Sequence, residues 1–147
     1  MGIKIKVRQG TFHECVALSK QIPEFESPYE LDEYEERCGG VHFVLIAKIK
    51  EKSVGFKVGY DRFNDGSFYS WMGGVLPEFR RIGIADALAE FQEKWAVKNG
   101  FNSIKLKTRD KHRDMIQFSL NRGFNILEKI NKQPAEETRI WMRKVLL

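Results

Sequence analysis

The chain has 147 residues, of which 42% are hydrophobic and 31% charged, and its formal net charge is +5. This length suits a single core, so we expect one domain over residues 1–147, and the hydrophobic fraction excludes a wholly disordered chain. No apolar run approaches the roughly 18 residues that cross a bilayer, and residues 1–10 lack the apolar segment of a secretory signal. We therefore expect a cytoplasmic protein without a membrane partner.

The first half of the chain predicts a strand, two helices and then an antiparallel meander. These segments are residues 3–7 (strand), 11–22 and 31–38 (helices), and 41–50, 53–60 and 68–76 (strands). The strands alternate apolar and polar residues, and Thr11 with Glu14 has the spacing of a capping box. Gly73 and Gly74 interrupt the last strand, which predicts a bulge or the close approach of another backbone.

The second half predicts a helical crossover between parallel strands. Its segments are residues 84–97 (helix), 103–108 (strand), 114–120 (helix), and 124–130 and 139–146 (strands). Apolar residues recur along the first helix at Ile84, Leu88, Phe91 and Trp95. A strand–helix–strand crossover of this kind is nearly always right-handed. The order β-α-α-β-β-β-α-β-α-β-β predicts an α+β fold with a mixed sheet of about seven strands and four helices.

Charged residues and cysteines limit the chemistry. Acidic residues crowd one early stretch, with Glu24, Glu26, Glu30, Asp32, Glu33, Glu35 and Glu36, and basic residues crowd a later one, with Lys105, Lys107, Arg109, Lys111, Arg113 and Arg122. The basic stretch favours a polyanion, either a phosphorylated cofactor or nucleic acid, whereas the acidic stretch is a solvated face or a site for a cation. Cys15 and Cys38 belong to no CxxC motif or histidine cluster, so we expect no disulfide and no metal site.

The turn at residues 80–85, Arg-Arg-Ile-Gly-Ile-Ala, gives the strongest functional signal, because it joins a strand to the start of an amphipathic helix. The first helical amides have no intrahelical partner, and the peptide dipoles place about half a positive charge there. Gly83 permits close approach of a ligand, so the turn predicts a phosphate site. It differs from a Walker loop, since no Lys-Ser/Thr follows, and from a Rossmann loop, since the upstream sheet is antiparallel.

This turn and element order resemble the GNAT superfamily of N-acetyltransferases over nearly the whole chain. The acetyl-CoA signature of that family, Gln/Arg-x-x-Gly-x-Gly/Ala, is matched by Arg80, Gly83 and Ala85, and Gly123-Phe124 is similar to the family's usual Gly-Phe. The resemblance implies a GNAT-like fold with acetyl-CoA as co-substrate. The implied pyrophosphate ligands are the backbone amides of Arg81, Ile82, Gly83, Ile84 and Ala85, with Arg80 lining the loop.

The resemblance also implies roles for the preceding strand and for the short helix. The pantothenate arm is expected between the strand before the turn and the strand after the helix, beside Gly74, Val75 and Leu76. The N–H of Val75 or Gly74 is the implied donor to the thioester oxygen, which is often worth about 3–4 kcal/mol. Ser119 stands where many members have a tyrosine, and it either binds the sulfur or a water or simply packs. His112 stands where an asparagine often contacts the cofactor, and it either donates a hydrogen bond or is an exposed loop residue.

The function implied by the resemblance is transfer of an acetyl group from acetyl-CoA to a primary amine of a small molecule or peptide, by direct attack in a ternary complex. The expected partners are CoA and an amine acceptor, cationic if the acidic stretch faces it, and a homodimer stays open. The first alternative is a non-catalytic acyl-CoA-binding module of the same fold, consistent with Ser119. The second is a nucleic-acid-binding domain that uses Lys105 to Arg113, which the placement of the motif disfavours.

Overall fold

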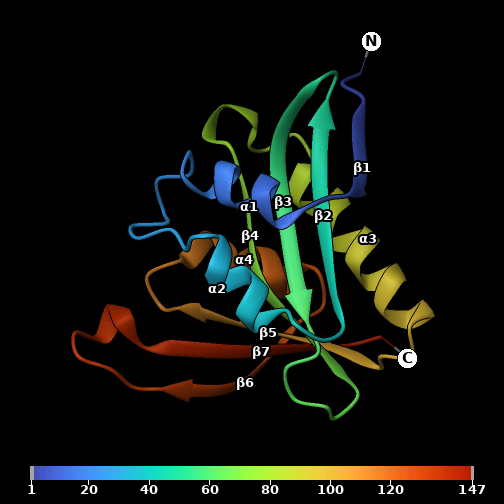
Figure 1. The fold of residues 1–147 in the computed structure, drawn as a ribbon. Coiled ribbons are helices and arrows are strands. Elements are labelled where there is room, and N and C mark those ends of the chain that lie inside the picture. The colour runs from blue at the N-terminus through green and yellow to red at the C-terminus, as the bar shows by residue number, and fades with distance from the viewer. Residues whose placement is uncertain (1, 147) are drawn as a thin grey trace. The chain divides into compact units, whose positions relative to one another are not determined.

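The computed structural model describes residues 2–146, so Met1 and Leu147 of the predicted domain lie outside the described residues. The strands are β1 (Ile5–Gln9), β2 (His42–Ile49), β3 (Lys52–Tyr60), β4 (Ser67–Val75), β5 (Ser103–Arg109), β6 (Asn125–Ile130) and β7 (Arg139–Val145) (Figure 1). The helices are α1 (Phe12–Ser19), α2 (Leu31–Arg37), α3 (Ile84–Lys98) and α4 (Arg113–Asn121), and short 3-10 helices occupy Pro77–Phe79 and Ala135–Glu137.

The seven strands are hydrogen-bonded in the order β1-β2-β3-β4-β5-β7-β6. The β4–β5 pair is parallel, whereas β1–β2, β2–β3, β5–β7 and β6–β7 are antiparallel. The α+β fold with a mixed seven-stranded sheet and four helices is therefore confirmed.

The chain is divided into two compact units. The first comprises the residues up to Asp61 together with Ser70–Trp95, and the second comprises Arg62–Tyr69 together with the residues from Ala96 onward. The prediction of one domain over the whole chain stays a prediction.

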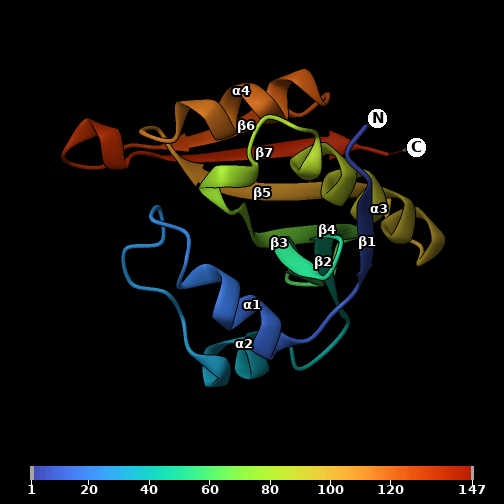
Figure 2. The ribbon, with the colours of Figure 1, turned by 90° about the horizontal axis from the view of Figure 1, so that it is seen from above.

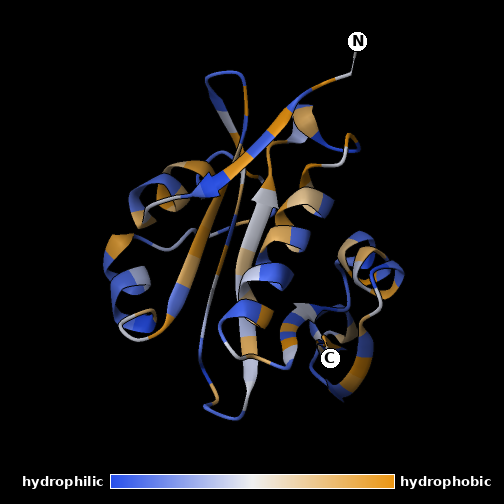
Figure 3. Cartoon of the chain, turned by 90° about the vertical axis from the view of Figure 1, so that its right-hand side faces the viewer, coloured by the Kyte–Doolittle hydropathy of each residue, from blue (hydrophilic) through white to orange (hydrophobic). Residues whose placement is uncertain are grey.

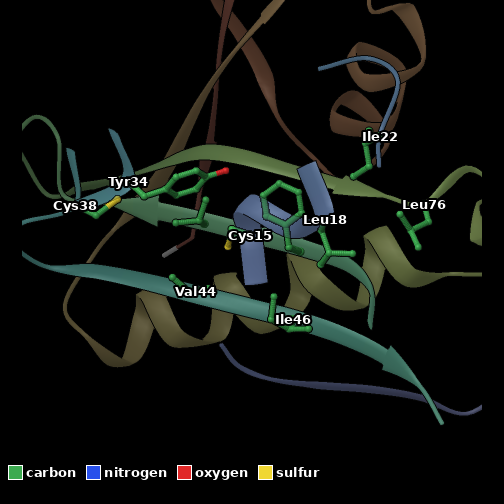
Figure 4. Packing of buried hydrophobic residues seen from close by; sticks show 10 residues of the cluster. Cys15, Leu18, Ile22, Tyr34, Cys38, Val44, Ile46 and Leu76 are labelled. Atoms are coloured by element: carbon green, nitrogen blue, oxygen red, sulfur yellow. The ribbon is translucent and has the colours of Figure 1, made fainter. Parts of the chain in front are cut away.

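In the first unit, helices cover both faces of β2 and β3 (Figures 1 and 2). One face packs against α1 and α2, and its buried residues are Cys15, Leu18, Ile22, Tyr34, Cys38, Val44, Ile46, Phe56, Val58 and Leu76 (Figure 4). The other face packs against the start of α3 through Leu45, Ala47, Val54, Val75, Ile84 and Leu88. Because successive side chains of a strand point to opposite faces, β2 contributes to both cores.

The buried face of α3 differs from the predicted stripe at one position. Ile84 and Leu88 are buried as expected, but Phe91 is 49% exposed, and Gln92 is buried at 2% in its place. At about 100° per residue, the buried face is centred between Leu88 and Gln92, so Phe91 lies at its edge. Trp95 stacks on Phe43 of β2 at a centroid distance of 4.4 Å. Figure 3 shows hydrophobic and hydrophilic residues alternating around the turns of the helices.

Two element ends near the N-terminus differ from the expected ones. The first strand is Ile5–Gln9 rather than residues 3–7, because Arg8 and Gln9 are registered opposite Ile46 and Leu45 of β2. The predicted capping box of α1 is present, but the helix ends at Ser19 rather than at residue 22.

In the second unit, the start of β4 pairs with β5, and β7 lies between β5 and β6. Figure 2 shows α4 alongside β7 and β6. Ile104, Leu106, Ile140 and Met142 are buried, whereas every residue of β6 is exposed. The intervening residues of β5 and β7 therefore lie on the opposite face of these strands.

Candidate functional site

The turn before α3 has a backbone that the sequence predicts only in part. After β4, the Phe79 N–H donates to the Leu76 carbonyl at 2.9 Å, and the chain then enters the predicted loop. Arg81 has φ 65° and Gly83 has φ 96°, both in the left-handed region. Left-handed residues within a turn direct neighbouring amides toward a common side, which is how backbone nests bind anions.

The amides of this loop are available to a ligand. Within residues 2–146, none of the N–H groups of Arg81 to Ala85 donates a hydrogen bond to the protein, and the Ala87 N–H donates to the Gly83 carbonyl at 3.0 Å. Ile84 is 2% exposed and anchors the first helical turn in the core, while the loop residues beside it are exposed. Unpartnered amides at the start of a 15-residue helix form a site at which a phosphate can bind.

Gly83 is required by its backbone conformation rather than by packing inside the protein. A Cβ built at this position meets only the Cδ1 atom of Ile5, at 3.9 Å, but a residue with a side chain is strained at φ 96°. The absence of a side chain also leaves the amides open to a ligand. The loop is therefore compatible with the prediction that Gly83 lets a ligand approach the backbone closely.

Arg80 makes contacts that the sequence does not predict. Its Nη1 and Nη2 atoms donate to the two carboxylate oxygens of Glu24 at 2.9 and 2.8 Å, and its Nε donates to the Val75 carbonyl at 3.0 Å. The side chain thus connects the phosphate loop to the end of β4 and to the segment between α1 and α2. Its predicted lining of the cofactor loop stays a prediction.

The end of β4 is tightly packed against the segment after α1 and against β3. A Cβ on Gly74 would lie 2.7 Å from the Cδ1 atom of Ile22, and one on Gly73 would lie 3.1 Å from the Phe56 carbonyl oxygen. The predicted close approach of another backbone is therefore present at Gly73, whereas Gly74 is approached by a side chain. Val75 is 8% exposed, and the Leu76 N–H donates to the Val54 carbonyl at 2.8 Å. The amide of Leu76 is thus used by the fold, and donation from Gly74 or Val75 to the thioester stays a prediction.

The β4–β5 register is short. Among the described residues it comprises Ser67, Phe68 and Tyr69 opposite Ser103, Ile104 and Lys105, whereas β4 continues to Val75 and β5 to Arg109.

The two predicted site residues in the second unit lie on α4. Ser119 is 1% exposed, and within residues 2–146 its Oγ has no hydrogen-bond partner. His112 is the N-cap of α4 but makes no side-chain cap bond. The His112 N–H donates to the Arg109 carbonyl at 2.9 Å, so the backbone of His112 links β5 to the helix. The roles of both side chains stay predictions.

Aromatic rings gather beside the acidic stretch in the first unit. The Trp71 ring on β4 lies 5.0 Å from that of Tyr34, 5.5 Å from that of Tyr29 and 6.0 Å from that of Tyr60. The Arg37 guanidinium lies 4.9 Å from the Trp71 centroid and 5.4 Å from that of Tyr29. The sequence does not indicate a role for Trp71 or Arg37. A tryptophan on a strand is typical of a hydrophobic core, and a single arginine on an acidic helix is typical of the solvent-exposed surface.

Protonation in this cluster follows burial and hydrogen bonding. Burial raises the pKa of Tyr34 well above its usual range, so this phenol stays protonated at neutral pH. Burial lowers the pKa of Arg37, but its hydrogen bonds to Glu33 and Tyr60 outweigh that effect and hold the pKa above its usual value. The Arg37–Glu33 pair measures 2.7 Å. The cluster therefore contains a permanent cation, Arg37, and a fully buried neutral phenol, Tyr34.

No helix in the described part of the chain is long and apolar enough to cross a membrane. Residues 2–146 contain no group of three or more His, Cys, Asp and Glu side chains that could hold a metal ion.

Solved acetyltransferase structures share this fold. The chain superposes with a TM-score of 0.82 on the ribosomal-protein-S18-alanine N-acetyltransferase of Escherichia coli, at 15% identity over 97% of this chain and 94% of that one. It superposes with a TM-score of 0.80 on an aminoglycoside 6'-N-acetyltransferase complexed with coenzyme A, at 17% identity over 97% of both chains. For yncA of Salmonella typhimurium, solved with acetyl-CoA, the TM-score is 0.76 at 16% identity, over 97% of this chain and 94% of that one.

At these identities the three structures establish the fold alone. The sequence itself supplies the family, because the model of the Acetyltransferase (GNAT) family matches residues 12–124. That range includes the strand before the turn, the turn at residues 80–85 and the helix that follows it. The chain therefore belongs to the GNAT family of acetyltransferases, as its resemblance implied.

Proposed function

We propose that the protein transfers an acetyl group from acetyl-CoA to a primary amine of a small molecule or peptide, by direct attack in a ternary complex. The observation that carries this proposal is the set of unpartnered amides from Arg81 to Ala85 at the start of α3. These amides bind the pyrophosphate of the co-substrate, and the positive end of the helix dipole favours the bound charge. The bound acetyl-CoA supplies the thioester carbon that the amine attacks.

The end of β4 polarises the thioester in this proposal. The N–H of Val75 or Gly74 donates to the thioester oxygen, on which negative charge grows as the amine attacks. The Arg80 bond to the Val75 carbonyl supports this role, because it fixes the next peptide of the strand.

The acceptor enters beside the aromatic and acidic residues of the first unit. The exposed carboxylates of α2 and the segment before it, Glu26, Asp32, Glu35 and Glu36, favour a cationic molecule. Two of the similar proteins are N-acetyltransferases by name, which supports an amine as the attacked group. A lysine-like amine, with a pKa of about 10.4, must lose a proton before it attacks.

A non-catalytic acyl-CoA-binding module is the second candidate, and Ser119 favours it. By resemblance this residue replaces a tyrosine, and its hydroxyl is much less acidic than a phenol. It is also buried at 1%, with no partner for its Oγ among the described groups. In the catalytic proposal, Ser119 binds the sulfur or a water; in the module it only packs.

Substitution of Gly83 by Asp tests the phosphate site. A carboxylate among the amides repels the pyrophosphate, so we expect CoA affinity by calorimetry to fall at least about a hundredfold, or about 2.7 kcal/mol. Gly40→Asp is the matched control, because a Cβ at Gly40 meets nothing within 4 Å. Gly83→Ala adds the backbone strain without the charge, and thermal melting checks that each variant is folded. Unchanged CoA affinity in folded Gly83→Asp would refute the site.

Thiol release separates the two candidates once CoA binding is established. Free CoA thiol is measured with acetyl-CoA and a panel of polyamines, aminoglycosides and amino-terminal peptides. The transferase releases thiol in proportion to acetylated amine. Binding of CoA without release above background for any amine in the panel would identify the module instead.

A further inference from the structure

The second unit has a cationic sheet face that the acetyl-transfer proposal does not use. In the β5–β7 register, Lys105 lies opposite Arg143, Lys107 opposite Trp141, and Arg109 opposite Arg139. These six residues alternate with the buried residues of the same strands, so they share the face away from that core. Like charges directly opposite on neighbouring strands repel each other, and here Glu137 lies between Arg109 and Arg139, at 3.1 and 3.6 Å.

The carboxylates on this face are too few to neutralise it. Asp65 binds Lys105 at 2.8 Å, and Glu137 binds Lys111 at 2.8 Å and Arg109 at 3.1 Å. Glu128 of β6 lies opposite Trp141. The cations that alternate along β5 and β7 on this face are Lys105, Lys107, Arg109, Arg139 and Arg143. They outnumber these three carboxylates, so the face attracts an anionic partner.

The aromatic rings of this face are already covered by the protein's own cations. The Arg62 guanidinium lies 4.9 Å from the Tyr69 centroid and 5.5 Å from that of Trp141. Lys107 lies 5.3 Å from the Trp141 centroid, and Lys105 lies 4.8 Å from that of Phe63. Single-stranded nucleic acids bind such surfaces by stacking bases on open rings. Covered rings favour a ligand that is recognised by its charges alone.

We infer that this face, centred on Lys107, Trp141 and Arg143, binds an acidic polypeptide segment of another protein. Neighbouring same-face residues of a strand are about 6.7 Å apart, so an extended segment with acidic residues at alternate positions has the same repeat. The arginine guanidinium groups bind carboxylates through two parallel hydrogen bonds. The inference is independent of acetyl transfer, because it uses none of the residues that the proposed function assigns to the cofactor, the thioester or the acceptor.

The probe is a short fluorescent peptide of alternating Glu and Ser, measured by anisotropy against the full chain. We expect binding that weakens as salt increases, and no binding of the matched Gln–Ser peptide. Lys107→Glu combined with Arg143→Glu should lower the affinity at least tenfold. Lys94→Glu combined with Lys98→Glu makes the same change of net charge on exposed positions of α3 and should change it less than twofold.

Each other outcome overturns the inference. Equal binding of the Glu–Ser and Gln–Ser peptides, or an equal loss in the α3 variant, would exclude recognition by this face. Binding of single-stranded oligouridine without binding of the acidic peptide would identify a nucleic-acid surface instead. CoA affinity, measured on the same folded variants, should stay unchanged, so a failure here is distinct from a failure of the phosphate site.

Discussion

The guanidinium group of Arg80 joins three segments of the first unit by donating hydrogen bonds to both carboxylate oxygens of Glu24 and to the Val75 carbonyl. Arg80 and Glu24 are 37% and 49% exposed, so solvent screens the pair. Its bidentate geometry nevertheless links the segment between α1 and α2 to the phosphate loop. Arg80 therefore acts on the site through the backbone that it holds.

A double-mutant cycle distinguishes this role from direct phosphate binding. We expect Arg80→Met and Glu24→Gln each to lower the free energy of unfolding in urea by about 0.5–1 kcal/mol, with little further loss in the double variant. CoA affinity should weaken by a similar small factor in both single variants. A large loss of CoA affinity in Arg80→Met alone would show that the guanidinium binds the cofactor directly.

At the residue scale, the sequence predicts conformation better than partners. Gly83 could be assigned because a glycine in a strand-to-helix turn has a local backbone reason. The contact between Arg80 and Glu24 could not be predicted. The two residues are far apart in the sequence, and the sequence around each predicts only a charged residue on the surface. The same holds for Arg37 and Trp71, which come together only when α2 packs on β4.

Within β4, the Gly73-Gly74 pair shows how one element constrains its neighbours. A Cβ on Gly74 would lie 2.7 Å from Ile22 Cδ1, the atom that an isoleucine-to-valine change removes. We expect Gly74→Ala to destabilise the protein by about 1–3 kcal/mol through overpacking. Ile22→Val alone should cost about 0.5–1.5 kcal/mol, and the double variant should be more stable than Gly74→Ala.

Urea denaturation of these variants measures the cycle, and Gly40→Ala is the control at a glycine whose Cβ position is open. If Ile22→Val gave no rescue, the contact with Ile22 would not be what requires a glycine at residue 74. CoA titration of the same variants would then show whether Gly74 serves the cofactor instead.

Element order was predictable, whereas two element ends were not. Alternation and the capping box locate strands and helices because both patterns are local. The end of β1 depends instead on where β2 offers partners, which brings Arg8 and Gln9 into the strand. The end of α1 at Ser19 is followed by tighter turns, in which Gln21 and Ile22 donate to Leu18 and Ser19. Such bonds depend on how the helix packs, not on its own period.

At the scale of the whole molecule, the polarity of the sequence around a residue does not predict whether that residue is buried. Cys15 and Cys38 stand in polar sequence contexts, yet they are 0% and 2% exposed in the core of the first unit. A helix shows one residue in every three or four to the sheet, so charged neighbours in sequence do not keep a cysteine exposed. Burial of both thiols has a consequence for how the stability of the protein depends on pH.

Burial raises the pKa of Cys15 to about 12 and that of Cys38 to about 11, from an ordinary value of 9.0. Raised pKa values mean that the folded state keeps thiol protons which the unfolded chain releases above pH 9. The contribution is therefore complete below pH 9 and is lost as pH rises, by up to about 1.4 kcal/mol per pH unit for each thiol. We expect the free energy of unfolding, measured in urea with reductant, to decrease as pH rises from about 8 to 10, because the unfolded chain releases these protons.

The Cys15→Ala, Cys38→Ala double variant should be less stable at neutral pH, because packing is lost, but its free energy of unfolding should decrease less steeply at alkaline pH. An equal slope in both proteins would assign the alkaline loss to other groups, such as the buried phenol of Tyr34.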